Sequence, residues 1–202
     1  MTSTSTSAVP APGIPMPYPA MLDAAHVRAV NSRLVASPTG HVMASPARLP
    51  DAPDGPLRRL GLAVADAGPD SVFGEGRGAD RFATELLGIH RELLRRVLAQ
   101  AIVHLHARTS AGSTLLAMQL VEAQLAEIAM ALNADEAVPA QRRYADRQSR
   151  WRAHQRLVAA GRQLVRLFGA NGFLADGPGA DLYLAEVTGN TYLHPELEDD
   201  DD

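Results

Sequence analysis

The side chains that could do chemistry in this 202-residue chain are its arginines, histidines and carboxylates, because it contains neither cysteine nor lysine. All 19 of its Lys and Arg residues are arginine. The two absences exclude a Schiff-base lysine, a phosphate-binding-loop lysine, a thiol nucleophile, a disulfide and a cysteine-ligated metal centre. Guanidinium groups remain, and they bind phosphate oxygens through paired hydrogen bonds.

The seven histidines lack the spacing of a metal site or of a hydrolase triad. They stand at positions 26, 41, 90, 104, 106, 154 and 194. His104 and His106 are two residues apart, so their side chains diverge on a helix. The sequence contains no HExxH motif for zinc and no GxSxG motif for a nucleophilic serine. We therefore predict no metal site and assign no catalytic residue.

A series of motifs runs through the second half of the chain, and Gln119 follows Arg108 by 119 − 108 = 11 residues. In chain order, the motifs are Val72-Phe73-Gly74-Glu75-Gly76, Arg108-Thr109-Ser110-Ala111-Gly112, Gln119, Leu125-Ala126-Glu127-Ile128, Arg166-Leu167-Phe168-Gly169-Ala170-Asn171-Gly172-Phe173 and Leu182-Tyr183-Leu184. In this order and spacing, residues 57–195 resemble the C-terminal helical domain of the acyl-CoA dehydrogenase family. The 202 residues leave no room for that family's N-terminal helical domain or for most of its β-domain.

The resemblance implies a cofactor and a set of residues that bind it. In the family, the positions matched by Arg108, Gln119, Gly169 and Gly172 hold the pyrophosphate and adenosine of FAD, while a neighbouring subunit binds most of the flavin ring. The implied function is that of a partial subunit of an FAD-dependent acyl-CoA dehydrogenase-type oxidoreductase. Its implied partners are further copies of itself or a full-length family member, and its implied substrate is an acyl thioester or another small molecule.

The same residues also have a structural interpretation. Arg108 would end a helix near the negative pole of the helix dipole, and Gly169 and Gly172 would only form a tight turn. A second functional hypothesis is therefore a cofactor-free helical bundle that acts as a small-molecule isomerase or cyclase, or as a binding protein. A third is a structural adaptor that oligomerises through its helices.

The sequence departs from the family pattern at several positions. Ala111 replaces a phenylalanine, Arg166 a glutamine and Ala170 a glycine, and residues 187–192 contain no acid where the family usually has its catalytic glutamate. Some members place that base early in the first helix of the bundle. The two acids found there, Glu85 and Glu92, are more typical of ion pairs on a helix surface.

Long amphipathic helices must position these residues. Apolar side chains recur every three or four residues over 80–108, 114–132 and 139–167, and a short helix over 181–187 follows. The connections are mostly short, which is typical of antiparallel neighbours. We therefore predict an all-α protein whose residues 77–195 form a four-helix up-down bundle of the acyl-CoA dehydrogenase C-terminal type.

The segments that flank the bundle have a different character. Residues 1–56 are rich in Ser, Thr, Pro and Ala at their start and are broken by prolines at their end, so we predict an irregular or disordered arm. Residues 57–76 predict a short strand remnant and a hinge. Residues 196–202 form an acidic tail with six carboxylates.

The charge pattern bears on partners. Eight arginines and one acid lie between residues 142 and 166, and without the acidic tail the chain carries 19 − 17 = +2. Few aromatic residues accompany these arginines and no nucleic-acid motif does, so an anionic protein or a cofactor phosphate is a better match than nucleic acid. No apolar run approaches the ~20 residues of a membrane span and no signal peptide is recognised, so we expect a cytoplasmic protein without membrane contact.

Overall fold

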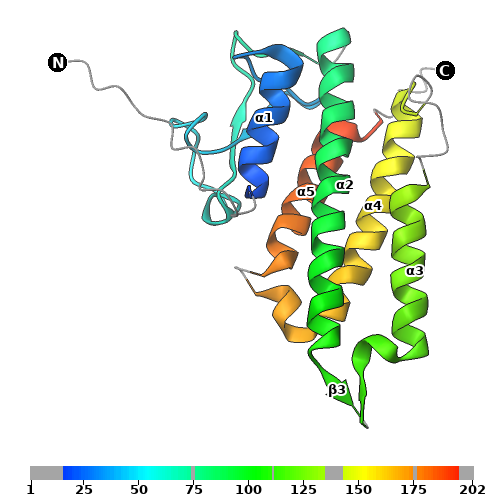
Figure 1. The fold of residues 1–202 in the computed structure, drawn as a ribbon. Helices are drawn as coiled ribbons and strands as arrows, with labels where there is room; N and C mark the ends of the chain where they lie inside the picture. The colour runs from blue at the N-terminus through cyan, green and yellow to red at the C-terminus, as the bar shows by residue number, and fades with distance from the viewer. Residues whose placement is uncertain (1–15, 74–75, 111, 135–142, 175–176, 196–202) are drawn as a thin grey trace, which may run out of the picture.

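The computed structural model describes residues 16–73, 76–110, 112–134, 143–174 and 177–195, and this part of the chain is mostly helical. Its α-helices are α1 (Tyr18–Val30), α2 (Arg77–His106), α3 (Gln119–Asn133), α4 (Arg147–Leu167) and α5 (Pro178–Leu193). Helices α2 to α5 lie side by side and run in alternating directions, and α1 lies beside α2 (Figure 1). The predicted helical class is confirmed, whereas the specific acyl-CoA dehydrogenase bundle type remains a prediction.

The long helix α2 organises the core, because it packs against each of the other four helices. Its buried apolar residues recur at helical spacing, as the sequence predicts, and include Phe82, Leu86, Leu87, Leu93, Leu94 and Val97. Leu157 and Leu164 of α4 and Leu184 of α5 join the same cluster. Each fully buried large apolar side chain contributes about 1.5–3 kcal/mol, so this shared cluster is the main force that holds the helices together.

Helix α4 begins later than the sequence predicts. Asp146 precedes its first residue, and the Asp146 carboxylate accepts a hydrogen bond from the backbone N–H of Ser149 at 2.6 Å. The Ser149 hydroxyl in turn lies 3.3 Å from the backbone N of Asp146, which completes a capping box. The expected start at Pro139 lies in residues 135–142, outside the described part of the chain.

Residues 16–56 correct the prediction of an irregular arm. Helix α1 packs against α2 and α5, and its Tyr18, Leu22 and Ala25 are fully buried. Pro17 and Pro19 did not indicate irregular structure here, because proline is compatible with the first turn of a helix, where the N–H groups have no helical partner. Residues 1–15, the start of the predicted arm, lie outside the described part.

Two short antiparallel sheets accompany the helices in the described residues. Strand β1 (His41–Ala44) pairs with β2 (Ala63–Asp66), and the 3-10 helix η1 (Arg58–Leu60) precedes β2. Strand β2 confirms a strand within the segment predicted to contain a strand remnant. Between α2 and α3, β3 (Thr109–Ser110) pairs with β4 (Ser113–Thr114), and a second 3-10 helix η2 (Leu115–Ala117) follows.

The hairpin and η2 delay the start of the next helix, so α3 begins at Gln119 rather than at residue 114. Between α4 and α5, the 3-10 helix η3 (Gly169–Phe173) occupies the glycine-containing segment. Helix α5 has 16 residues and extends beyond the predicted 181–187 at both ends. None of the described helices combines the length and the apolar character needed to cross a membrane. The motif residues Gly74, Glu75 and Ala111 and the acidic tail lie outside the description.

Candidate functional site

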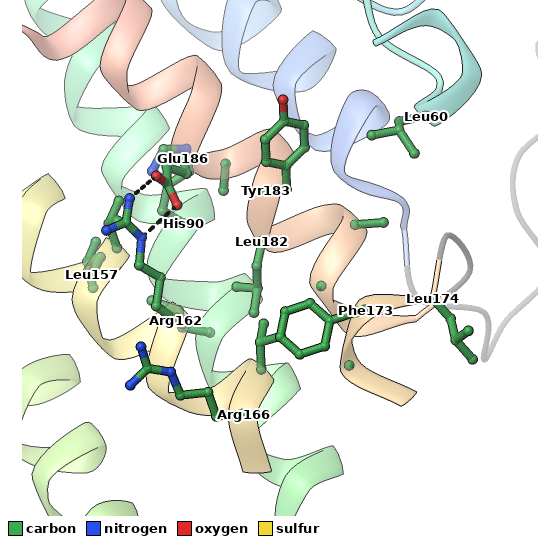
Figure 2. Close-up of a pocket in the computed structure, with 18 of the residues that line it drawn as sticks. Leu60, His90, Leu157, Arg162, Arg166, Phe173, Leu174, Leu182, Tyr183 and Glu186 are labelled. Carbon is green, nitrogen blue, oxygen red and sulfur yellow. Dashed lines mark hydrogen bonds and ion pairs between the residues drawn. The ribbon is translucent and has the colours of Figure 1, made fainter. Parts of the chain in front are cut away.

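A cavity of about 800 Å³ opens between α4 and α5 and is the candidate site (Figure 2). We call it the α4/α5 cleft. Helix α4 lines it with residues spaced three and four apart, which lie on one helix face: His154, Leu157, Val158, Gly161, Arg162, Val165 and Arg166. Residues of α5 and η3 form the facing wall and one end, α2 contributes two side chains, and η1 contributes Arg59 and Leu60.

The inner wall of the cleft is apolar. Leu94, Leu157 and Leu182 are at least nine-tenths buried, and the backbone of Gly161 lies between them. The outer rim is apolar as well but exposed, since Phe173 is 74% exposed and Leu174 is 54% exposed. Solvent-exposed large apolar side chains at the entrance of an apolar cavity are typical of a ligand-binding cleft.

Three guanidinium groups, those of Arg59, Arg162 and Arg166, border the cleft. Arg162 is neutralised by Glu186 of α5 through two parallel hydrogen bonds from one edge of its guanidinium group, with Nε donating to Oε2 at 3.2 Å and Nη2 to Oε1 (Figure 2). This pairing raises the pKa of the Arg162 guanidinium further. Arg59 and Arg166 have exposed side chains and make no ion pair with a carboxylate among the described residues. Within the described part of the chain, no carboxylate therefore offsets their charge.

Two buried imidazoles, His90 of α2 and His154 of α4, also line the cleft, with their ring centroids 5.6 Å apart. The Tyr18 hydroxyl lies 2.8 Å from His90 Nε2 and also hydrogen-bonds Thr188. Burial lowers the pKa of His90 well below its ordinary value, and the neighbouring His154 adds to the effect. His90 is thus a neutral side chain whose Nε2 is already engaged by α1.

His154 has one engaged ring nitrogen and one buried ring nitrogen without a partner in the described residues. Its Nε2 lies 3.0 Å from the amide oxygen of Asn190, but its buried Nδ1 has no hydrogen-bond partner among the described residues. Burial is the main cause that lowers the pKa of His154, so its ring is neutral at pH 7. Gly189 makes room for this ring, because a Cβ there would lie 2.0 Å from Cε1 of His154.

The structure brings one of the four predicted FAD-binding residues into the cleft. Gly172 lines it, whereas Arg108, Gln119 and Gly169 do not. Arg108 is exposed beyond the end of α2, with Nη1 3.5 Å from Nε2 of His104, and Gln119 is exposed at the first turn of α3. Gly169 has a φ of +58°, which favours glycine. The FAD interpretation of these residues remains a prediction that rests on the resemblance.

Close packing accounts for the glycines around η3. A Cβ on Gly172 would lie 2.4 Å from the carbonyl oxygen of Val165, and a Cβ on Gly179 would lie 2.0 Å from the carbonyl oxygen of Gly172. Only glycine permits these approaches of η3 to α4 and α5. Backbone atoms of the protein therefore occupy the space that a side chain at position 172 would need. These contacts position the end wall of the cleft.

Several residues of the cleft have no role in the sequence-based predictions. Arg59, His90, His154 and Glu186 come from four different elements, and only their tertiary arrangement brings them together. The three- and four-residue spacing of the cleft-lining residues of α4 was the available signal, and the sequence analysis read this helix only as arginine-rich. The comparisons with known proteins add no assignment, since no protein-family model and no curated protein matches this chain.

Proposed function

We propose that this protein binds a small amphipathic anion in the α4/α5 cleft and that it does so without a cofactor. The observation that carries the proposal is an apolar cavity of about 800 Å³ bordered by the exposed guanidinium groups of Arg59 and Arg166, for which the described residues supply no carboxylate partner. The volume lies within the range of about 300–1,000 Å³ that is usual for small-molecule sites. The apolar inner wall would bury the ligand's body, and the arginines would hold its charged group.

A carboxylate is the anion that we assign to this site. A guanidinium group binds a carboxylate through two parallel hydrogen bonds, as Arg162 already does with Glu186 in the same cleft. Arg166 lies one turn farther along α4 on the same face, so a ligand carboxylate can be recognised by the same chemistry. The apolar rim formed by Phe173 and Leu174 would cover the adjacent part of the ligand.

Titration with dodecanoate tests the proposal. We expect saturable binding of one molecule per chain by calorimetry and a change in the emission of Trp151, the single tryptophan of the chain. The Arg166→Gln variant should weaken binding about 10- to 100-fold, because it removes a charge-assisted hydrogen-bond donor. Arg152→Gln is the matched control, since Arg152 is an exposed arginine of α4 that does not line the cleft.

The outcome that contradicts the proposal is equally specific. If dodecanoate does not bind at millimolar concentration, or if Arg152→Gln and Arg166→Gln weaken it by the same factor, the cleft is not an anion site. A circular dichroism spectrum of each variant shows whether the helices are intact, which separates a loss of binding from a loss of folding.

A further inference from the structure

We propose that the ligand of the α4/α5 cleft is a dicarboxylate, with one carboxylate bound by Arg166 of α4 and the other by Arg59 of η1. This assignment rests on the proposed function and deepens it, because it gives the two arginines two separate anionic groups of the same ligand. The ligand would span the cleft from wall to wall, with an apolar chain between its charged ends.

The two arginines border the cleft from different sides. Arg166 lies in the last turn of α4, whereas Arg59 belongs to η1 and directly precedes Leu60. Leu60 packs against the hydrophobic core, which holds η1 in place. Figure 2 shows Leu60 and Arg166 on opposite sides of the cleft, with Leu182 between them. A ligand that contacts both arginines therefore has to cross the floor formed by α5.

Both guanidinium groups are accessible to a ligand, since the side chains of Arg59 and Arg166 are exposed. Within the described ranges, neither one has a carboxylate partner. A carboxylate binds a guanidinium group most strongly through two parallel hydrogen bonds, which occupy both of its oxygens. A ligand with a single carboxylate can make this contact with one arginine at a time. A dicarboxylate can make it with both.

The surface between the two arginines matches an apolar linker. Val165, Leu182 and Phe173 line the cleft from α4, α5 and η3. Glu186 is the carboxylate among the described lining residues, and both of its oxygens accept hydrogen bonds from Arg162. Its negative charge is thus offset within the protein, so it does not prevent a second carboxylate from binding. A flexible methylene chain with an anion at each end fits this order of surfaces.

Dicarboxylates of increasing length test the assignment: hexanedioate, octanedioate, decanedioate and dodecanedioate, each compared by calorimetry with its own monomethyl ester. The ester has the same chain and one charge fewer. At the length that spans the cleft, we expect the dicarboxylate to bind the wild-type protein about tenfold more tightly than its ester, because it gains a charge-assisted pair of hydrogen bonds. A series of lengths is used so that a mismatch of one probe does not decide the result.

Variants assign the preference to its residue. In Arg59→Gln the preference for the dicarboxylate should vanish while the ester keeps its affinity, because its one carboxylate stays at Arg166. Arg152→Gln is the matched control and should keep the preference, since Arg152 is an exposed arginine outside the cleft. Loss of the preference in Arg152→Gln as well would show a general attraction to the arginine-rich α4 and would overturn the assignment.

The failures of the two proposals are distinguishable. If every dicarboxylate binds the wild-type protein no more tightly than its ester, or if Arg59→Gln keeps the preference, the second carboxylate is overturned, and ester binding that depends on Arg166 leaves the anion site standing. If neither the esters nor the dicarboxylates bind, both proposals fall. The comparison of each dicarboxylate with its ester uses only the wild-type protein, so it holds even if Arg59→Gln does not fold.

Discussion

His26 and His154 are both fully buried imidazoles, yet they have different complements of hydrogen bonds. The backbone N–H of Val35 donates to Nδ1 of His26 at 3.1 Å, and Nε2 of His26 donates to the carbonyl oxygen of Met43 at 3.0 Å. Both ring nitrogens of His26 are thus satisfied by the protein. His154 has one engaged nitrogen, and its buried Nδ1 has no hydrogen-bond partner among the described residues.

This difference in hydrogen bonding is what distinguishes the two buried histidines. Burial lowers the pKa of both residues, to about 4 for His26, so a lowered pKa does not distinguish them. His26 stacks on Phe82 at a centroid distance of 4.4 Å and joins α1 to β1, which is a structural role. His154 borders the α4/α5 cleft, and its ring packs against Gly189 of α5.

The largest effect that we predict is the loss of stability in His26→Leu. The substitution leaves the backbone N–H of Val35 and the carbonyl of Met43 buried without partners, and each such group costs about 1–3 kcal/mol. We expect the free energy of unfolding in urea to fall by about 4 kcal/mol. His41→Leu is the control, because His41 is exposed and should change stability little. A loss below about 1 kcal/mol in His26→Leu would contradict the structural role.

Acid should destabilise the wild-type protein through the same residue. Between the ordinary histidine pKa of 6.5 and about 4, the unfolded chain binds a proton that folded His26 does not, so stability falls as the pH falls. This contribution amounts to about 3 kcal/mol and is complete near pH 4. His90 and His154 have the same sign. Asp181 opposes them at the acidic end, because burial raises its pKa.

Urea unfolding at pH 7, 5.5 and 4 measures this effect. His26→Leu should lose less stability than the wild-type protein over this range, because the titrating group is absent. An equal pH dependence of the two proteins would show that other groups cause the acid sensitivity.

The helices were the predictable part of the fold. The three- and four-residue spacing of apolar residues in α2 gave its length within a few residues, because one buried stripe specifies a helix directly. Helix α1 was missed because prolines flank its first turn and because its Tyr18 and His26 are buried through tertiary hydrogen bonds. Strand β1 was missed because four residues carry little periodicity.

The candidate site was predictable only in part. The sequence indicated arginines for anion binding and singled out the segment at 169–173, and η3 does place Gly172 and Phe173 against the cleft. It could not indicate that Glu186 pairs with Arg162, while Arg166 has no carboxylate partner in the described ranges, because that depends on how α5 packs against α4. An unpartnered buried nitrogen is likewise a property of the packed state alone.

An intermediate effect on stability is expected for Gly189→Ala, which tests how tightly the ring of His154 is packed. The added Cβ would lie within 2.6 Å of three atoms of the His154 ring, so the ring or α5 must shift. We expect a loss of about 2 kcal/mol from this overpacking, measured by urea unfolding. Gly88→Ala is the matched control, since a Cβ on this exposed glycine of α2 meets nothing within 4 Å. Gly88→Ala should raise the free energy of unfolding by up to about 1 kcal/mol.

The cause of the Gly189→Ala effect can be isolated with a second substitution. In a His154→Ala background the ring is absent, so Gly189→Ala should become close to neutral. If the penalty persists there, the glycine is required by the backbone of α5 and the ring is not the reason.

The smallest effect should come from Glu186→Gln, which removes the carboxylate partner of Arg162. The variant releases a third guanidinium group in the cleft, so dodecanoate should bind severalfold more tightly. Stability should change little, because Arg162 is exposed and surface ion pairs contribute little. If the affinity for dodecanoate falls instead, Glu186 holds the walls of the cleft in place, and the number of guanidinium groups without a carboxylate partner does not limit binding.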